Sequence, residues 1–249
     1  MGPAVAAFIL ATALLTSILS GVFGMAGGLV LMGALALVLP VSAALVTHGL
    51  IQMAANGWRA ILHRQHLQWS IVGFYALGSA AVAGLLALVA FVPSKPLLYL
   101  LLGLVPGLIW LPKRIVALDA AKPAHALACG VCVTGLNLTA GVAGPLLDIF
   151  FVRTGLTRHR IVATKAATQV FSHLAKVMVY GAPLLRTGGK GMPPAWVFVF
   201  AIPLAMAGTV IGGRMLERMT DAGFIRYSRW IITAIGLAYL AQAAQLYFG

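Results

Sequence analysis

Three long stretches without a charged residue constrain the fold of this chain more than any other feature. They cover Trp69–Val92, Ala195–Gly213 and Trp230–Phe248, with 24, 19 and 19 residues. As an α-helix, each stretch is long enough to cross the roughly 30 Å hydrocarbon core of a bilayer. Charged residues make up 8% of the chain, whereas soluble domains contain about 25%. The sequence therefore predicts an all-α, polytopic helical membrane protein embedded in a lipid bilayer.

The basic net charge is explained by the membrane and does not indicate a nucleic-acid partner. The formal charge is +13, and most Lys and Arg residues lie in short segments between the apolar stretches. Such basic segments favour the cytoplasmic side of a membrane. Residues 1–20 carry no Lys or Arg before their apolar stretch, so we expect them to be retained and not cleaved as a signal peptide.

An internal repeat divides the chain into two related halves. The segment Gly21–Gly24 (GVFG) recurs 120 residues later as Gly141–Gly144 (GVAG). A second pattern, T-[HK]-x3-Q-x3-[NH]-x2-[RK], covers Thr47–Arg59 and recurs 117 residues later over Thr164–Lys176. Because both landmarks keep their order, we expect one membrane domain built from a duplicated unit. Its predicted parts are a first repeat (1–112), a cytoplasmic linker (113–123) and a second repeat (124–249).

Each repeat begins with an apolar stretch that glycines interrupt, Ala4–Leu39 in the first repeat and Ala124–Val152 in the second. The second stretch has 29 residues, so it is either a tilted crossing or a re-entrant hairpin whose arms meet near the middle of the membrane. A hairpin places twelve basic residues on one face and three on the other, whereas a crossing places seven against eight. The stronger bias favours the hairpin. In the hairpin topology, the basic face carries Arg59, Arg64, Lys113, Arg114, Lys122, Arg153, Arg158, Arg160, Arg214, Arg218, Arg226 and Arg229, and the other face carries Lys95, Arg186 and Lys190.

Three uninterrupted spans follow each hairpin in this interpretation. Because three is odd, the two repeats enter the membrane with opposite orientations. Inverted repeats with interrupted helices are typical of secondary transporters, which hold their substrate near the middle of the membrane. The predicted fold is two inverted repeats, each a glycine-broken re-entrant hairpin plus three transmembrane helices. The predicted spans are 43–62, 69–92, 96–111, 160–181, 195–213 and 230–248.

Polar residues recur along one face of the first span in each repeat. At positions i, i+4, i+8 and i+11 of a helix, four side chains fall within an arc of roughly 80°. We interpret the two polar stripes as the lining of one cavity, because ionisable residues at membrane depth usually mark the pathway of a substrate or ion. The alternative is that Arg59 and Lys176 reach the membrane surface while the amides join helices. The stripes are His48, Gln52, Asn56 and Arg59 in the first repeat, and Lys165, Gln169, His173 and Lys176 in the second.

The glycine breaks supply a second candidate element of a binding site. A helix that restarts after a turn at membrane depth presents free backbone amides, which attract anions. Glycine also lets the backbone approach a ligand closely, although close helix packing is the alternative explanation. Backbone amides and cationic side chains together predict a small anionic substrate. The candidate glycines are Gly24, Gly27, Gly28, Gly141 and Gly144.

Asp148 is the acidic residue that we expect at membrane depth. Two roles fit it: a structural ion pair with Lys165, or the uptake of a proton during transport. The structural ion pair is slightly favoured. An Asp beside the site would oppose a divalent anion unless Lys165 neutralises it.

Two other classes of function remain open. Cys129 and Cys132 have the C-x-x-C spacing of a thiol-redox pair, but small residues three apart also pack helices together. A biogenesis or scaffold protein that transports nothing is the other alternative. The sequence contains no Walker loop, nucleophile elbow or H-E-x-x-H motif and no metal-ligand spacing. We therefore expect no enzyme activity, no cofactor and no metal.

The glycine-rich segment Gly21–Gly28 (GVFGMAGG), Pro40, the helix Thr47–Arg59 and the approach His66–Trp69 (HLQW) resemble the TauE/SafE family of sulfite exporters. The resemblance implies a permease of the bacterial inner membrane that exports sulfite, organosulfonates or similar anions without ATP, with a proton gradient as a candidate driving force. A homo-oligomer is compatible with it. The chain departs from the family pattern where Ala26 interrupts the glycines and where residues 145–148 (PLLD) replace the second glycine cluster.

Overall fold

The computed structural model describes residues 1–23, 26–111, 118–218 and 221–249, with side chains throughout these ranges except in 221–228. The secondary structure of the described residues is entirely helical, which confirms the predicted all-α class. The α-helices are α1 (Pro3–Phe23), α2 (Ala26–Val38), α3 (Val41–Leu62), α4 (Trp69–Val89), α5 (Lys95–Leu104), α6 (Pro123–Ala140), α7 (Gly144–Phe151), α8 (Arg158–Arg186), α9 (Ala195–Leu216) and α10 (Asp221–Phe248), and the 3-10 helices are η1 (Arg64–His66) and η2 (Val105–Trp110).

Four helices in the described ranges are long and apolar enough to cross a membrane. They are α1, α4, α9 and the Arg229–Phe248 part of α10. α3 and α8 cover two further predicted spans with 22 and 29 residues, and they carry the polar stripes. The predicted span 96–111 is not one regular helix, because α5 passes into η2 at Val105. Pro106 lacks the backbone N–H that an α-helix needs there.

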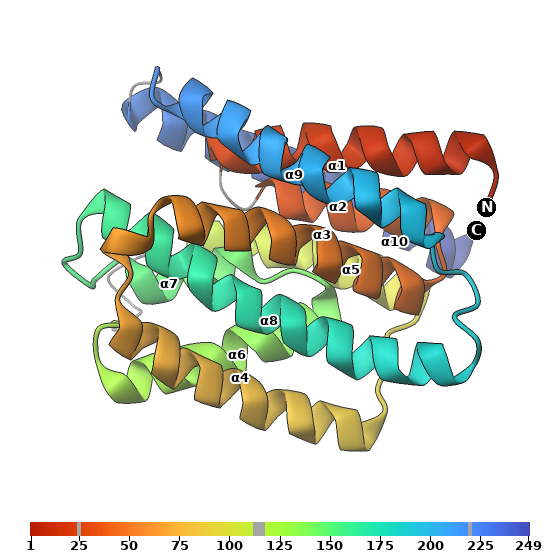
Figure 1. Ribbon diagram of the computed structural model, residues 1–249, viewed down its shortest axis with the longest axis horizontal. Coiled ribbons are helices and arrows are strands. Elements are labelled where there is room, and N and C mark those ends of the chain that lie inside the picture. The colour runs from red at the N-terminus through yellow and green to blue at the C-terminus, as the bar shows by residue number, and fades with distance from the viewer. Residues whose placement is uncertain (24–25, 112–117, 219–220) are drawn as a thin grey trace.

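The helices pack in pairs around a central pair formed by α3 and α8. Figure 1 shows α3 and α8 side by side, with α1 and α9 on one side of them and α4 and α6 on the other. α1 packs against α9, α4 packs against α6, and α5 packs against α10. α3 also contacts α9, and α4 contacts α8. The polar stripes therefore lie at the middle of the helix bundle.

Segment 123–151 forms a helical hairpin. α6 ends at Ala140 and is followed by Gly141, which has a φ of 78° that favours glycine, and α7 starts at Gly144. The backbone N–H of Ala120 donates a hydrogen bond of 2.9 Å to the carbonyl of Phe150. The two ends of the segment therefore lie together, as in the hairpin alternative and unlike a single crossing.

The first glycine-broken stretch, which we predicted to be a re-entrant hairpin, consists of two helices of unequal length. α1 has 21 residues and α2 has 13, and α1 alone is long enough to span a membrane. The physical reason is that residues 4–20 contain neither Gly nor Pro, so the helix runs without a break to Phe23. The predicted turn residue Gly24 lies outside the described residues.

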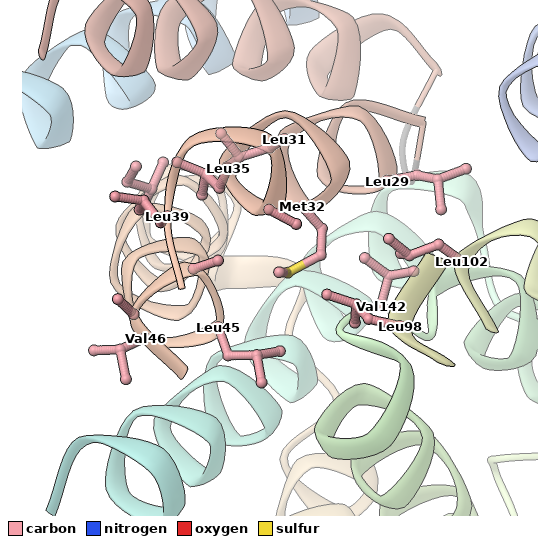
Figure 2. Packing of buried hydrophobic residues seen from close by; sticks show 14 of the residues in the cluster. Leu29, Leu31, Met32, Leu35, Leu39, Leu45, Val46, Leu98, Leu102 and Val142 are labelled. Atoms are coloured by element: carbon pink, nitrogen blue, oxygen red, sulfur yellow. The ribbon is translucent and has the colours of Figure 1, made fainter. Parts of the chain in front are cut away.

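α2 is buried inside the protein and anchors the main hydrophobic core. Figure 2 shows Leu29, Met32 and Leu35 of α2 directed toward side chains of α3 and α5. At 13 residues, α2 is about 20 Å long, too short to cross a bilayer. A short helix with open ends is tolerated at membrane depth when protein surrounds it. The apolar side chains packed around α2 thus provide the protein environment that such a short helix needs.

Close approach of α4 and α6 depends on two glycines. A Cβ atom on Gly78 would collide with the carbonyl oxygen of Leu127, and one on Gly130 would collide with that of Tyr75. Because these neighbours are backbone atoms, they cannot yield by changing a rotamer. The two helices therefore cross at a distance that only glycine permits.

We predict that Gly130→Ala lowers the free energy of unfolding by about 1–3 kcal/mol, the usual effect of overpacking. Gly84→Ala in the neighbouring helix is the control, because a Cβ atom there has nothing within 4 Å. That control is expected to be neutral or slightly stabilising. Unfolding of the purified protein in mixed detergent micelles measures both values. Equal stability of the two variants would contradict the packing role of Gly130.

Candidate functional site

A cavity of about 530 Å³ lies between α3 and α8, within the usual size range of small-molecule sites. It reaches the end of the bundle where α1, α3 and α9 finish and α8 begins, since Phe23, Arg59, Arg158 and Leu216 are among its lining residues. Parts of seven helices thus surround one space. The predicted site residues that line it are Gly28, His48, Gln52, Asn56, Arg59, Gly144, Asp148, Lys165, Gln169 and His173.

The two polar stripes run in opposite directions along the cavity. Arg59 ends the stripe of α3 near Lys165, which begins the stripe of α8. At the other end of the stripes, His48 contacts Lys176, and its ring lies 5.5 Å from that of His173. The antiparallel packing of α3 and α8 therefore brings the two sequence patterns face to face.

Cationic groups dominate the outer part of the cavity. Arg59 has a buried Nη2 atom without a hydrogen-bond partner among the described residues. Arg158 also lines this part of the cavity. Lys165 forms an ion pair with Asp148, with side chains 23% and 36% exposed. The carboxylate of the cavity is therefore neutralised by a neighbouring lysine, and Arg59 offers a guanidinium nitrogen to a ligand.

Three histidines lie outside the spans near the same end of the bundle. The rings of His66 and His159 are 5.3 Å apart. Partial burial, together with the nearby His159, lowers the pKa of His63 below its ordinary value. His63 therefore loses its positive charge at a lower pH than an ordinary histidine does.

Deeper in the cavity, His173 and Asn137 offer polar atoms that have no partner. The Nδ2 atom of Asn137 lies 3.4 Å from Nδ1 of His173, and the two side chains are 3% and 4% exposed. Because the amide nitrogen of Asn137 donates, Nδ1 of His173 accepts. The proton of a neutral His173 is therefore on Nε2. Nε2 of His173 and Oδ1 of Asn137 have no partner within the described residues. A ligand in the cavity can accept a hydrogen bond from Nε2.

The sequence reasoning missed Asn137, although a signal for it was present. It is an amide in the apolar segment that precedes Gly141. Polar side chains at membrane depth are informative even when they have no counterpart in the other repeat. Asn137 stands alone, outside the repeated pattern that predicted the stripe residues.

Lys176 does not line the cavity, in contrast to the prediction. Its side chain is 0% exposed. Its Nζ donates to the carbonyl of Gly141 at 2.5 Å and to Nδ1 of His48 at 3.1 Å. His48 in turn donates from Nε2 to the carbonyl of Gly28 at 3.0 Å. Lys176 therefore lies behind the cavity wall and connects the break between α6 and α7 to the start of α2.

The candidate glycines have different roles in the structure. Gly28 and Gly144 line the cavity near the starts of α2 and α7. Gly27 packs against α1, because an added Cβ atom would collide with the carbonyl of Thr16. Gly141 allows the positive φ at the end of α6. The packing alternative thus applies to Gly27.

Cys129 and Cys132 are both free thiols. Cys129 is buried in the apolar cluster between α4, α6 and α7, whereas Cys132 is exposed. Among the described residues, no group of three or more His, Cys, Asp and Glu side chains is placed to hold a metal ion.

Comparison with known proteins identifies one family. The family model of the sulfite exporter TauE/SafE matches residues 9–239, which is nearly the whole chain. This match confirms the resemblance seen in the glycine-rich segments. No curated protein and no solved structure matches the chain. The match covers both glycine breaks and both polar stripes, and the chain therefore belongs to the sulfite exporter TauE/SafE family.

Proposed function

We propose that this protein is a secondary transporter that exports sulfite, an organosulfonate or a similar small sulfur-containing anion across the bacterial inner membrane. The observation that carries the proposal is the cavity between α3 and α8, where Arg59 keeps a buried guanidinium nitrogen without a partner. A buried, unpartnered donor on a cation is best satisfied by an anionic ligand.

The charge balance of the cavity supports an anionic substrate. Its lining contains three basic side chains, Arg59, Arg158 and Lys165, and one carboxylate, Asp148. Because Lys165 neutralises Asp148, we assign the anion to Arg59, whose buried Nη2 atom has no partner among the described residues. The Nε2–H of His173 adds a neutral donor at the inner end. Such a set of donors suits the oxygen atoms of a sulfur oxyanion.

The family and the helices agree with a transport function. Members of the family are membrane exporters, and with four candidate spans the chain is a multi-pass membrane protein. The proposed inverted repeat relates α1–α5 to α6–α10 in order. If each helix is replaced by its equivalent in the other repeat, the α1–α9 contact becomes α6–α4 and the α3–α9 contact becomes α8–α4, and both of these contacts are present. The α3–α8 and α5–α10 contacts remain the same pairs under this exchange. This symmetry of the helix packing supports a duplicated, inverted unit.

The location of the cavity supports access from one side of the membrane at a time. The outer part of the cavity contains Arg59 and Arg158, which belong to the face that collects most basic residues and is therefore expected to be cytoplasmic. The inner end is bounded by His48 and His173, with Lys176 behind them. An arrangement that opens toward one face suits alternating access between two repeats.

Uptake of radiolabelled sulfite into proteoliposomes that contain the purified protein tests the proposal. The assay is run with and without a pH gradient, and with taurine and sulfate as competitors. Protein-dependent sulfite flux is the expected result. The absence of flux for every sulfur oxyanion, in protein shown to be correctly inserted, would reject the proposed substrate class.

We predict that Gln52→Ala reduces this flux at least about tenfold, the effect of about 1.4 kcal/mol. The side chain of Gln52 lines the cavity next to Gly28, so its loss removes a polar contact at the proposed site. The control is Gln65→Ala, in an exposed residue of η1, with wild-type flux expected. Equal flux in both variants would exclude Gln52 from the site.

A further inference from the structure

Lys176 is a buried amine for which the described structure provides no negative partner. Its side chain is wholly buried near the middle of α8, and its Nζ contacts two neutral acceptors, the carbonyl of Gly141 and Nδ1 of His48. Asp148, the carboxylate that lines the cavity, forms an ion pair with Lys165 and not with Lys176. A buried ammonium without a counter-charge is strongly destabilising.

The number of acceptors around Lys176 suits a neutral amine. An ammonium has three N–H donors, whereas a neutral amine has two. The described contacts of Nζ are two acceptors, so the neutral form is fully matched and the ammonium leaves one donor without a partner. His48 can accept at Nδ1 because its Nε2 donates to the carbonyl of Gly28. Both forms of the amine keep the same two contacts, so a proton can be added without breaking them.

The charged and titratable groups near Lys176 are few. From α3 it faces His48, and on its own helix it is one turn from His173. The break between α6 and α7 presents a carbonyl group, and α2 presents another behind His48. Asp148 is engaged with Lys165 at the outer part of the cavity. An anion in the cavity against His173 would therefore be the closest negative charge to Lys176.

We propose that Lys176 is the proton carrier of the transporter, with a neutral amine when the cavity is empty and an ammonium when an anion occupies the cavity. This inference rests on the proposed function and deepens it. On loading, the lone pair of Nζ takes up a proton from water, and on release of the anion the proton returns to water on the other side. The anion and the proton then move in the same direction, and no bond other than N–H forms or breaks.

The coupling follows from thermodynamic linkage. If an anion favours the ammonium form of Lys176, protonation must favour anion binding by the same factor. A dianion that moves with one proton transfers one net negative charge instead of two, which changes the work done by the membrane potential. Asp148 is then not required as the proton site, because its carboxylate is committed to the ion pair.

The first test counts the protons taken up when sulfite binds to the purified wild-type protein, by calorimetry in buffers of different ionisation enthalpy. For each anion bound, the wild type is expected to take up about one proton more than Lys176→Met does. Sulfite's own titration contributes equally to both and cancels in the difference. Lys190→Met, in an exposed turn, is the control and should match the wild type. Lys176→Arg keeps a permanent charge, and is expected to bind sulfite without the additional proton. Equal proton numbers in wild type and Lys176→Met would overturn the proposal.

A second measurement does not depend on the substrate. Protein labelled with ¹⁵N at lysine Nζ is examined by NMR in the empty state at neutral pH, where a neutral-amine signal is expected that Lys176→Met removes. Thermal unfolding confirms that the variant is folded. A spectrum that contains ammonium signals alone would overturn the assignment to Lys176, even if sulfite flux is present. A neutral-amine signal without sulfite flux would instead reject the proposed substrate.

Discussion

Arg59→Met is expected to weaken sulfite binding by about 2–4 kcal/mol, a factor of about 30 to 1,000. The guanidinium lines the cavity with a buried nitrogen that has no partner among the described residues. Removing it deletes a charge-assisted hydrogen bond that only a bound anion completes. The same change removes an uncompensated, partly buried cation, so the stability of the empty protein is expected to stay equal or increase. Binding and stability should therefore change in opposite directions.

Equilibrium binding of labelled sulfite and thermal unfolding measure the two effects of Arg59→Met. Arg64→Met is the matched control, because Arg64 is exposed in η1 and does not line the cavity. It removes the same charge from the same end of the bundle and should leave sulfite affinity unchanged. If both variants lose affinity equally, the attraction comes from the overall basic surface and not from a contact of Arg59.

The sequence predicted the parts of the fold that depend on regular periodicity and on the absence of charge. The uncharged runs at Trp69–Val92 and Ala195–Gly213 became α4 and α9, with small differences at their C-terminal ends. The helical spacing of the stripes predicted which side chains share a face, and seven of the eight stripe residues line the cavity. A spacing argument succeeds here because an α-helix fixes the direction of each side chain relative to its neighbours.

The same argument could not predict what lies behind the cavity wall. Lys176 shares the face of Lys165 and His173 by spacing, but the carbonyl of Gly141 and the ring of His48 enclose its amine. That enclosure depends on where the break between α6 and α7 falls in space. Helical periodicity carries no information about such long-range contacts, so the structure was needed to separate Lys176 from the lining residues.

The glycines illustrate the second limit of the sequence. Gly27 and Gly28 are neighbours in the chain, but Gly27 faces α1 and Gly28 faces the cavity. Successive residues of a helix point about 100° apart, so one glycine can serve packing while the next approaches a ligand. The sequence identified the cluster, and the position of α1 decided the role of each member.

Lys165→Met is expected to reduce sulfite flux at least about 100-fold, and adding Asp148→Asn to it should restore most of the flux. The two side chains form an ion pair beside the cavity. Each unit charge roughly 6 Å from an anion changes its binding free energy by about 3 kcal/mol at an effective dielectric constant near 20. Removing the lysine alone deletes a favourable charge and exposes the anion to an unpaired carboxylate. The double variant removes the carboxylate charge as well.

Asp148→Asn alone separates the two roles that the sequence left open for Asp148. If the carboxylate only neutralises Lys165, this variant retains sulfite flux and its dependence on a pH gradient, with equal or tighter binding because one negative charge is gone. The proteoliposome assay at two opposite pH gradients measures both properties. Loss of the gradient dependence with flux preserved would assign proton coupling to Asp148 and count against Lys176. A double variant no better than Lys165→Met would show that Lys165 acts on the anion directly, independently of its ion pair.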